Sequence, residues 1–232
     1  NLWQKEPLFN LIVKENPQFK NYIFHDADTF PDNPSWALAI KNMLDNHEYC
    51  VVQNGYQFED TIYKNRNKMM YVFSKSTIPG ENGGNPGLTV SMSKKTFDYI
   101  EGFPEFFVCG AGDVGLVLRT DKNCKYHSTV VNNCGWWQKE ADVIRNKVDF
   151  FFIPYKLTHF SHGAYKDRGH FYRNKTIEWL GVTDIRDCVK LGENGLVEYK
   201  KYNKQISYIL GNKPRLKTTE SSLEVVREAL LL

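Results

Sequence analysis

The stretch Tyr22-Ile-Phe-His-Asp-Ala-Asp-Thr-Phe-Pro31 runs from apolar residues into a pair of aspartates and stops at a proline. If Tyr22–Phe24 form a strand, Asp26 and Asp28 lie at its carboxyl end, the edge where open α/β sheets bind ligands. Acids two residues apart on a strand point the same way, and they repel each other unless a cation lies between them or one is protonated. The pattern indicates a site for a hard divalent ion, although an isolated Asp-x-Asp is more often a solvated acidic turn.

The composition of the 232-residue chain is that of a soluble globular protein, with 41% apolar and 25% charged residues. Its net charge of +3 is too small to argue for nucleic acid, and no nucleic-acid partner is expected. The chain has no apolar stretch near the roughly 18 residues of a membrane helix, and it opens without a signal-peptide pattern. Its five cysteines lack a Cys-x-x-Cys spacing, which favours reduced thiols. These features predict a cytoplasmic location and no transmembrane segment.

Hydrophobic periodicity and turn residues predict helices alternating with strands, which indicates an α/β protein. The expected strands cover residues 22–24, 49–53, 88–91 and 150–153. The expected helices cover residues 3–15, 36–44 and 114–119, and a further one that begins at Ser91 or Ser93 and ends at Ile100. For the helix at 36–44, Asn33 is the predicted cap and Pro34 the first helical residue.

Two glycine-containing segments lie between these elements. Residues 76–87 combine glycine, asparagine and proline, and such a loop either lets the backbone approach a ligand closely or is simply a flexible connection. Gly110-Ala-Gly-Asp113 leads into the helix expected at 114–119, where the helix dipole favours a carboxylate. Asp113 is therefore a functional acid or, more simply, a helix cap.

A segment with histidines and arginines follows the apolar strand expected at 150–153. It opens with His159-Phe-Ser-His162-Gly163 and continues to Arg173. Imidazoles placed after a strand are able to ligate a metal, and basic side chains hold phosphates. Taken alone, the two histidines fit ordinary polar packing better.

The order of these motifs resembles the catalytic core of GT-A glycosyltransferases. Asp26-Ala-Asp28 is followed by Gly83-Gly84, then by Gly102-Phe-Pro-Glu105 and Gly110-Ala-Gly-Asp113, and last by His159-Phe-Ser-His162-Gly163. The sequence looks closest to glycosyltransferase-2-like enzymes and the β-1,4-galactosyltransferase type. For residues 1–180 the resemblance implies a GT-A-like (Rossmann-like) mixed sheet flanked by helices. Residues 181–232 are expected to form a small, mostly helical C-terminal extension that ends in a helix.

The resemblance implies a metal-dependent, inverting glycosyltransferase that moves a sugar from a nucleotide sugar to a hydroxyl group. The expected donor is a UDP-sugar, and the acceptor is a glycan, a protein or another hydroxyl compound. In such enzymes the second aspartate of Asp-x-Asp and a later histidine hold the metal, so Asp28 and His162 are the implied ligands, with His159 as an additional one. Carboxylate and imidazole ligands suit Mn²⁺, with Mg²⁺ as the second choice.

Donor-binding roles follow from the same resemblance. Asp26 is expected to contact the ribose or the sugar, or to reach the metal through water. Gly83 and Gly84 match a glycine pair near the sugar. Arg168 and Arg173 are expected to hold the diphosphate, for which the planar guanidinium is well suited.

Asp113 matches the aspartate that deprotonates the acceptor hydroxyl in inverting members of the family. The family usually has an acid directly before this aspartate, whereas this sequence has Gly112. A second departure is that only one expected helix precedes the Asp-x-Asp strand, where a GT-A domain has about three βα units that bind the nucleotide base. Residues 1–180 are therefore expected to lack these first units or to replace them from elsewhere.

Two other interpretations stay open at this point. The short front and Gly112 favour a non-catalytic GT-A-like module that binds a glycan or a partner chain. Asp26-Ala-Asp28 also begins the first motif of haloacid-dehalogenase-type phosphatases. That motif wants threonine or valine where this chain has Phe30, and we find no convincing later lysine and paired-acid motif.

Overall fold

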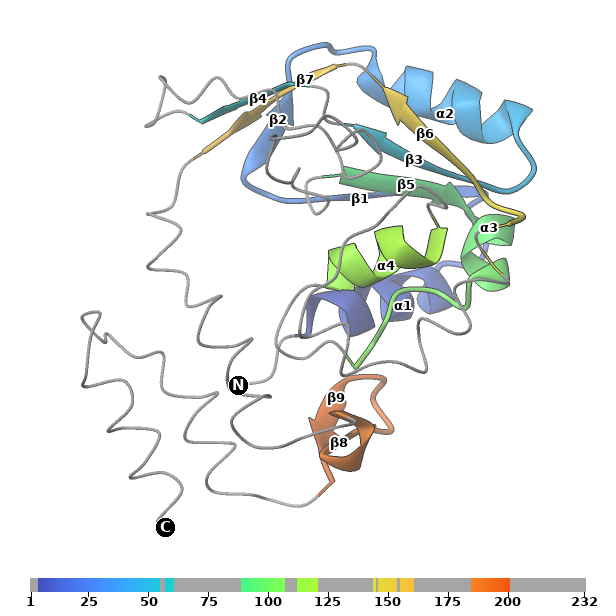
Figure 1. The fold of residues 1–232 in the computed structure, drawn as a ribbon, viewed down its shortest axis with the longest axis vertical. Helices are drawn as coiled ribbons and strands as arrows, with labels where there is room; N and C mark the ends of the chain where they lie inside the picture. Colours follow the sequence, from blue (N-terminus) through green and yellow to red (C-terminus); the bar gives the residue numbers. More distant parts are fainter. Residues whose placement is uncertain are drawn as a thin grey trace.

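The computed structural model describes residues 4–54, 57–60, 89–106, 112–120, 144, 146–153, 155–160 and 185–200 of the chain. In these ranges the protein is a mixed α/β structure built around a four-stranded sheet, with helices on both faces (Figure 1). The α/β class predicted from the sequence is thereby confirmed. Within the same ranges, no helix combines the length and the apolar character needed to cross a membrane.

The main sheet has the strand order β1-β5-β3-β6. Its strands are β1 (Asn21–His25), β5 (Thr89–Ser93), β3 (Cys50–Asn54) and β6 (Asp149–Ile153). Strand β5 runs antiparallel to both of its neighbours, and β6 runs parallel to β3. Strands β1, β3 and β6 therefore share one direction, so their carboxyl ends lie at the same edge of the sheet.

A smaller sheet begins directly after the Asp-x-Asp turn. It has the order β2-β7-β4, from strands β2 (Thr29–Pro31), β7 (Lys156–His159) and β4 (Gln57–Asp60). Strand β7 pairs antiparallel with β2 and parallel with β4. This pairing brings the end of β7 next to the turn that follows β1.

Helix α2 (Trp36–Asn46) covers one face of the main sheet (Figure 1). Its buried side chains pack on the residues of β3 and β6 that point to this face; the cluster is Ile40, Leu44, Cys50, Val52 and Ile153. The predicted cap Asn33 and the predicted first helical residue Pro34 are both wrong, because the helix begins at Trp36 and its cap position is Ser35, whose side chain makes no capping hydrogen bond. Asn33 instead accepts a hydrogen bond from the Ser35 backbone N–H at 2.8 Å, which closes the turn before the helix.

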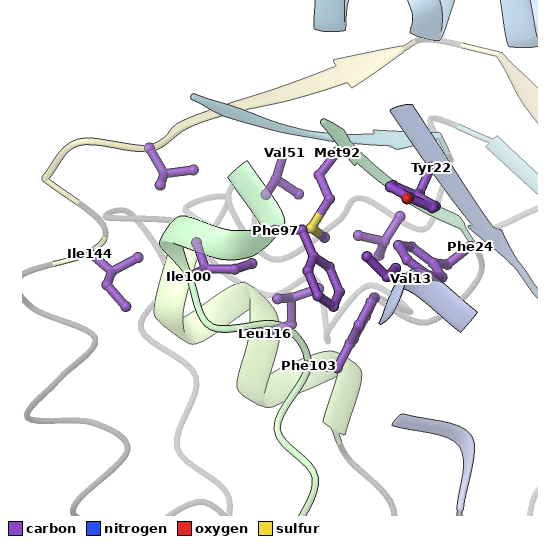
Figure 2. Close-up of a cluster of buried hydrophobic side chains, with 12 residues drawn as sticks. Val13, Tyr22, Phe24, Val51, Met92, Phe97, Ile100, Phe103, Leu116 and Ile144 are labelled. Carbon is purple, nitrogen blue, oxygen red and sulfur yellow. The ribbon is translucent and has the colours of Figure 1, made fainter. Parts of the chain in front are cut away.

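Helices α1 (Lys5–Glu15), α3 (Lys94–Tyr99) and α4 (Gly112–Thr120) cover the opposite face (Figures 1 and 2). Val51 points to this face while its neighbours in β3 point to α2, as the alternation of strand side chains requires. The core between the sheet and the three helices contains Val13, Tyr22, Phe24, Val90, Met92, Phe97, Ile100, Phe103 and Leu116. Packing in this core holds α1 and α4 against the sheet.

Helix α3 is closed at both ends by local hydrogen bonds. The hydroxyl of Ser93 accepts from the backbone N–H of Thr96 at 3.1 Å, so one of the two predicted caps is confirmed. At the other end, Gly102 (φ 75°) donates its backbone N–H to the Phe97 carbonyl at 2.9 Å. This turn leads the chain from α3 to the Gly102-Phe-Pro-Glu105 segment.

The described part of the C-terminal region differs from the mostly helical extension that the sequence predicts. It contains a short 3-10 helix, η3 (Ile185–Asp187), and a hairpin of β8 (Val189–Leu191) and β9 (Val197–Tyr199). The hairpin is anchored to the start of α1, because Gln4 donates to the Val197 carbonyl at 2.7 Å and accepts from the Val197 N–H at 3.0 Å. The helix predicted at the C-terminus lies outside the described residues.

Candidate functional site

The Asp-x-Asp turn between β1 and β2 is closed by Thr29. Its backbone N–H and its hydroxyl both donate to the Asp26 carbonyl, at 3.1 and 2.9 Å. His25 adds a second tie, since its Nε2 lies 2.6 Å from the Thr29 carbonyl and its Nδ1 lies 2.6 Å from the Thr89 hydroxyl. A carbonyl only accepts, so Nε2 carries the proton and the ring of a neutral His25 accepts from Thr89. The turn predicted at the strand end is confirmed, and its backbone is fixed.

Two predicted site residues that are far apart in the sequence, Asp26 and Asp113, line the same recess. Asp26 follows β1, whereas Asp113 lies in the first turn of α4. The recess is small, with a cavity volume of about 10 Å³, and its lining comprises Lys5, Glu6, Phe9, Phe24, Asp26, Val90, Phe103 and Asp113.

Lys5 forms an ion pair with Asp26, with its Nζ 2.5 Å from Oδ1 of the carboxylate. Both side chains are about three-quarters buried, with relative exposures of 26% and 28%. Burial alone would lower the pKa of Lys5. The charge and hydrogen bond of Asp26, together with the charges of Asp113 and Glu6, outweigh burial, so the pKa of Lys5 is raised. An ammonium group is therefore the resident cation at the first carboxylate of Asp-x-Asp.

Glu6 brings a further carboxylate into the recess, and only 3% of this residue is exposed. It packs on Gly112 so closely that a Cβ at position 112 would come nearer than 3.0 Å to the Glu6 carboxylate. The close packing of Glu6 gives the glycine at position 112 a steric reason. Sequence analysis missed Lys5 and Glu6, because nothing in their local pattern tells a charged residue facing a site from one facing solvent.

The floor of the recess is aromatic. Phe9, Phe24 and Phe103 form a triangle with ring centroids 4.7–5.2 Å apart, and the Lys5 ammonium lies 5.8 Å from the Phe9 ring (Figure 2 labels Phe24 and Phe103). Asn10 of α1 fixes this floor, since it accepts from the Phe103 N–H at 2.8 Å and donates to the Phe103 carbonyl at 3.0 Å. The charged groups thus lie against an apolar aromatic surface, where water screens their charges less.

Asp28, the predicted metal ligand, is outside the lining of the recess and lies beside the end of β7. Its carbonyl accepts from the Phe160 N–H at 2.7 Å, and Thr29 pairs with His159 in the strand register. The backbone at His159 therefore lies next to the Asp-x-Asp turn, as a shared site requires.

The other predicted site residues, Gly83, Gly84, His162, Arg168 and Arg173, lie outside the described residues. Within the part of the chain that the structure describes, no three His, Cys, Asp or Glu side chains are close enough together to hold a metal ion. Asp28 is a suitable oxygen ligand for Mn²⁺ or Mg²⁺, so a complete metal site would need ligands from segments such as the one containing His162.

Comparison with known proteins adds no relative to this picture. No protein-family model, no curated protein and no solved structure matches the chain. The functional argument therefore rests on the residues of the site and on their geometry.

Proposed function

We propose that this chain is a metal-dependent, inverting glycosyltransferase that transfers a sugar from a nucleotide sugar, expected to be a UDP-sugar, to an acceptor hydroxyl. The observation that carries the proposal is the meeting of Asp26 and Asp113 in one recess. Acids from distant parts of a chain that gather with a partly buried, perturbed lysine in one recess mark a candidate functional site.

The arrangement of the main sheet also supports a GT-A-like architecture. Asp26 and Asp28 follow β1 at the edge where the carboxyl ends of β1, β3 and β6 lie together, which is where open α/β sheets bind ligands. Helices cover both faces of this mixed sheet (Figure 1).

In the proposed reaction, Asp113 takes the proton of the acceptor hydroxyl as that oxygen attacks the sugar. Such general-base help contributes about 10²–10⁴-fold to the rate. Asp28 and His162, with His159 as an additional ligand, would hold Mn²⁺ or Mg²⁺. When bound, the ion offsets the charge that builds on the leaving diphosphate.

The remaining predicted residues bind the donor. Asp26 contacts the ribose or the sugar, and Gly83 and Gly84 let the backbone approach the sugar closely. Arg168 and Arg173 hold the diphosphate by bidentate hydrogen bonds.

The test begins with a thermal-shift screen of UDP-glucose, UDP-galactose, UDP-N-acetylglucosamine and UDP-N-acetylgalactosamine, each with and without Mn²⁺. A bound donor raises the melting temperature by mass action. We expect Asp28→Ala to abolish both the Mn²⁺-dependent shift and turnover. Asp113→Asn is expected to keep the shift and lose transfer. Asp98→Asn, on the far end of α3, serves as the matched control and should change neither.

Unchanged turnover in Asp28→Ala would remove the metal from the proposal, and transfer that survives in Asp113→Asn would place the base elsewhere.

A second candidate is a non-catalytic module that binds a glycan or a partner chain. The observation that favours it is the Lys5–Asp26 ion pair, since Lys5 already occupies the carboxylate that would contact the ribose or the sugar of a donor. Calorimetry with Mn²⁺ and the same four UDP-sugars separates the two functions. An enzyme binds at least one donor, whereas a non-catalytic module that has lost the donor site releases no heat with any of them.

A further inference from the structure

We infer that Glu6 is a positioning residue for Asp113, and that its carboxylate occupies the space of a side chain at position 112. Glu6 would then supply, from α1, the second acid beside the base on α4. The inference rests on the proposed function, because it assigns Glu6 a role in the proton transfer that Asp113 performs there.

Helix α1 packs against α4 through the side chain of Glu6. A Cβ on residue 112 would come within 3.0 Å of the Cγ, Cδ and Oε1 atoms of Glu6, a distance that real Cβ atoms do not reach. With any other residue at position 112, the Glu6 side chain would have to move from the place that it occupies. The next residue in the chain is Asp113, so the two carboxylates enter the same recess from neighbouring helices.

The position of the Glu6 carboxylate also has an electrostatic consequence. The carboxylate of Glu6 lies at the first turn of α4, where the helix dipole favours negative charge. It is almost fully buried, so solvent screens it little. When Glu6 is ionised, its negative charge favours the protonated form that Asp113 reaches when it takes the acceptor proton.

Lys5 completes the group from the position next to Glu6. The negative charges of Asp26, Asp113 and Glu6 all act on its ammonium group. Consecutive residues at the start of α1 thus reach the surroundings of both acids: Lys5 pairs with Asp26, and Glu6 packs on Gly112, the residue before Asp113. This pairing gives the first turn of α1 a role in orienting the site as well as in packing.

The test moves the carboxylate from one helix to the other. Glu6→Gln keeps the volume and removes the charge, Glu6→Ala removes both, and the double variant Glu6→Ala with Gly112→Glu returns a carboxylate to the same space from α4. Transfer is measured in the full chain with Mn²⁺, the UDP-sugar that gives the largest thermal shift and a panel of p-nitrophenyl glycosides as acceptors. Glu48→Gln, at an exposed ion pair with Lys95, is the matched control.

We expect Glu6→Gln to lower kcat about tenfold or more, since an interaction with a charged group is typically worth that factor. Its KM for the donor and its melting temperature should stay close to those of the unchanged protein. The double variant should recover most of the kcat that Glu6→Ala loses. A purely structural role would give the opposite pattern, with kcat kept in Glu6→Gln.

Two outcomes overturn the inference: full kcat in Glu6→Gln, or a double variant no better than Glu6→Ala. If the unchanged protein transfers no sugar at all, the proposed function fails and the inference fails with it. If the unchanged protein transfers sugar and one of the two outcomes above is found, only the inference fails.

A stability cycle checks the packing separately. Gly112→Ala should lower the melting temperature when Glu6 is present and should not lower it in the Glu6→Ala background. Equal effects in the two backgrounds would show that Glu6 does not fill this space, and would overturn the inference on geometry alone.

Discussion

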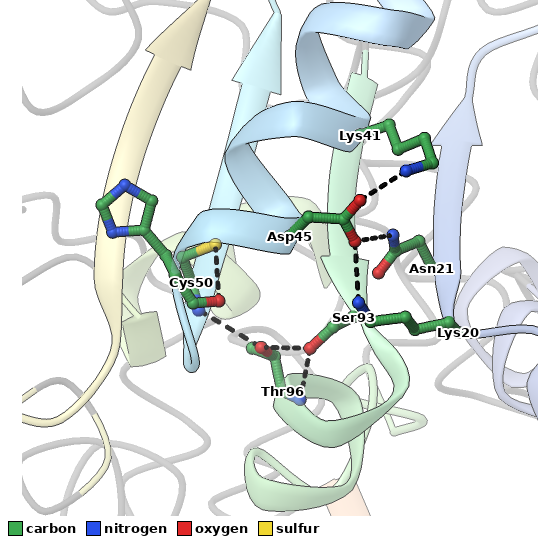
Figure 3. Close-up of polar contacts among 8 residues, drawn as sticks. Lys20, Asn21, Lys41, Asp45, Cys50, Ser93 and Thr96 are labelled. Carbon is green, nitrogen blue, oxygen red and sulfur yellow. Dashed lines mark hydrogen bonds and ion pairs between the residues drawn. The ribbon is translucent and has the colours of Figure 1, made fainter.

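An aspartate forms an ion pair with a lysine at each end of strand β1, but the two charge clusters are built differently. At the amino end, Asp45 of α2 accepts from Lys20 at 2.8 Å, from Asn21 at 3.3 Å and from Lys41 (Figure 3). At the carboxyl end, Asp26 accepts from Lys5 and shares its recess with Glu6 and Asp113.

The difference lies in the balance of charge and in the exposure of the lysines, since the side chains of Asp26 and Asp45 are equally exposed. At Asp45 donors outnumber the carboxylate; the hydrogen bond from Lys20, with those from Lys41 and Asn21, holds the pKa of Asp45 well below its usual range. In the recess, among the described residues, three carboxylates surround one ammonium group. A surface cluster of the first kind serves stability weakly. An excess of partly buried like charge is costly, and such sites are typically kept for function.

The largest expected effect comes from removing the lysine at each end. Lys5→Met leaves the recess with carboxylates alone, so we expect a loss of about 1–3 kcal/mol in the free energy of unfolding. Lys41→Met, the matched control at an exposed pair, should change it by less than about 0.5 kcal/mol. Urea unfolding at pH 7 without divalent ions measures both. Equal losses in the two variants would contradict the contrast between the ends.

A smaller effect is expected at the hydroxyl groups that fix the backbone near each end. Thr29→Val removes the hydrogen bond to the Asp26 carbonyl, and Ser93→Ala removes the cap of α3 that Figure 3 shows. Each should cost about 1 kcal/mol. Only Thr29→Val should also weaken Mn²⁺-dependent binding of a UDP-sugar, because it loosens the Asp-x-Asp turn. Calorimetry of both variants checks this, and weaker binding in Ser93→Ala would mean that the loss is a general one.

The smallest effect separates the two ends by pH. The pKa of Asp45 lies below its ordinary value of 3.8, so its contribution to stability is present at neutral pH and is lost as the pH falls below about 4. The pKa of Lys5 lies above its ordinary value of 10.5, so its contribution is complete below that pH and is lost above it. Melting curves of Asp45→Asn and Lys5→Met should therefore approach those of the unchanged protein on opposite sides of neutrality. Convergence of both on the same side would contradict these assignments.

Local sequence patterns predict the elements of this fold that carry strong local signals. The apolar runs gave the positions of β1, β3 and β6, and the hydroxyl of Ser93 marked the start of α3. Asp113 was placed at the start of a helix, where it lies in α4. The prediction of Asn33 as the cap was wrong because its side chain accepts from the Ser35 backbone N–H in the preceding turn, which moves the start of the helix to Trp36.

The rest depended on tertiary packing. The rotation of α1 about its axis decides that Lys5 and Glu6 face the recess, and that rotation is set by Phe9 and Val13 packing on the core. No pattern within α1 reports it. The β8–β9 hairpin was also missed, because two three-residue strands become stable only when they pair with each other and with Gln4.

The central place of β5 in the sheet has a consequence for how the chain is made. Strand β5 lies between β1 and β3, and β6 flanks β3 on its other side, so β3 has neither of its neighbours when it leaves the ribosome. At about 5–20 residues per second, β5 follows only after several seconds. During that time Cys50, Val51 and Val52, which are fully buried in the folded protein, lie on an unpaired strand edge that can pair with other chains. Early docking of α2, which needs only residues already synthesised, shields one face of this strand.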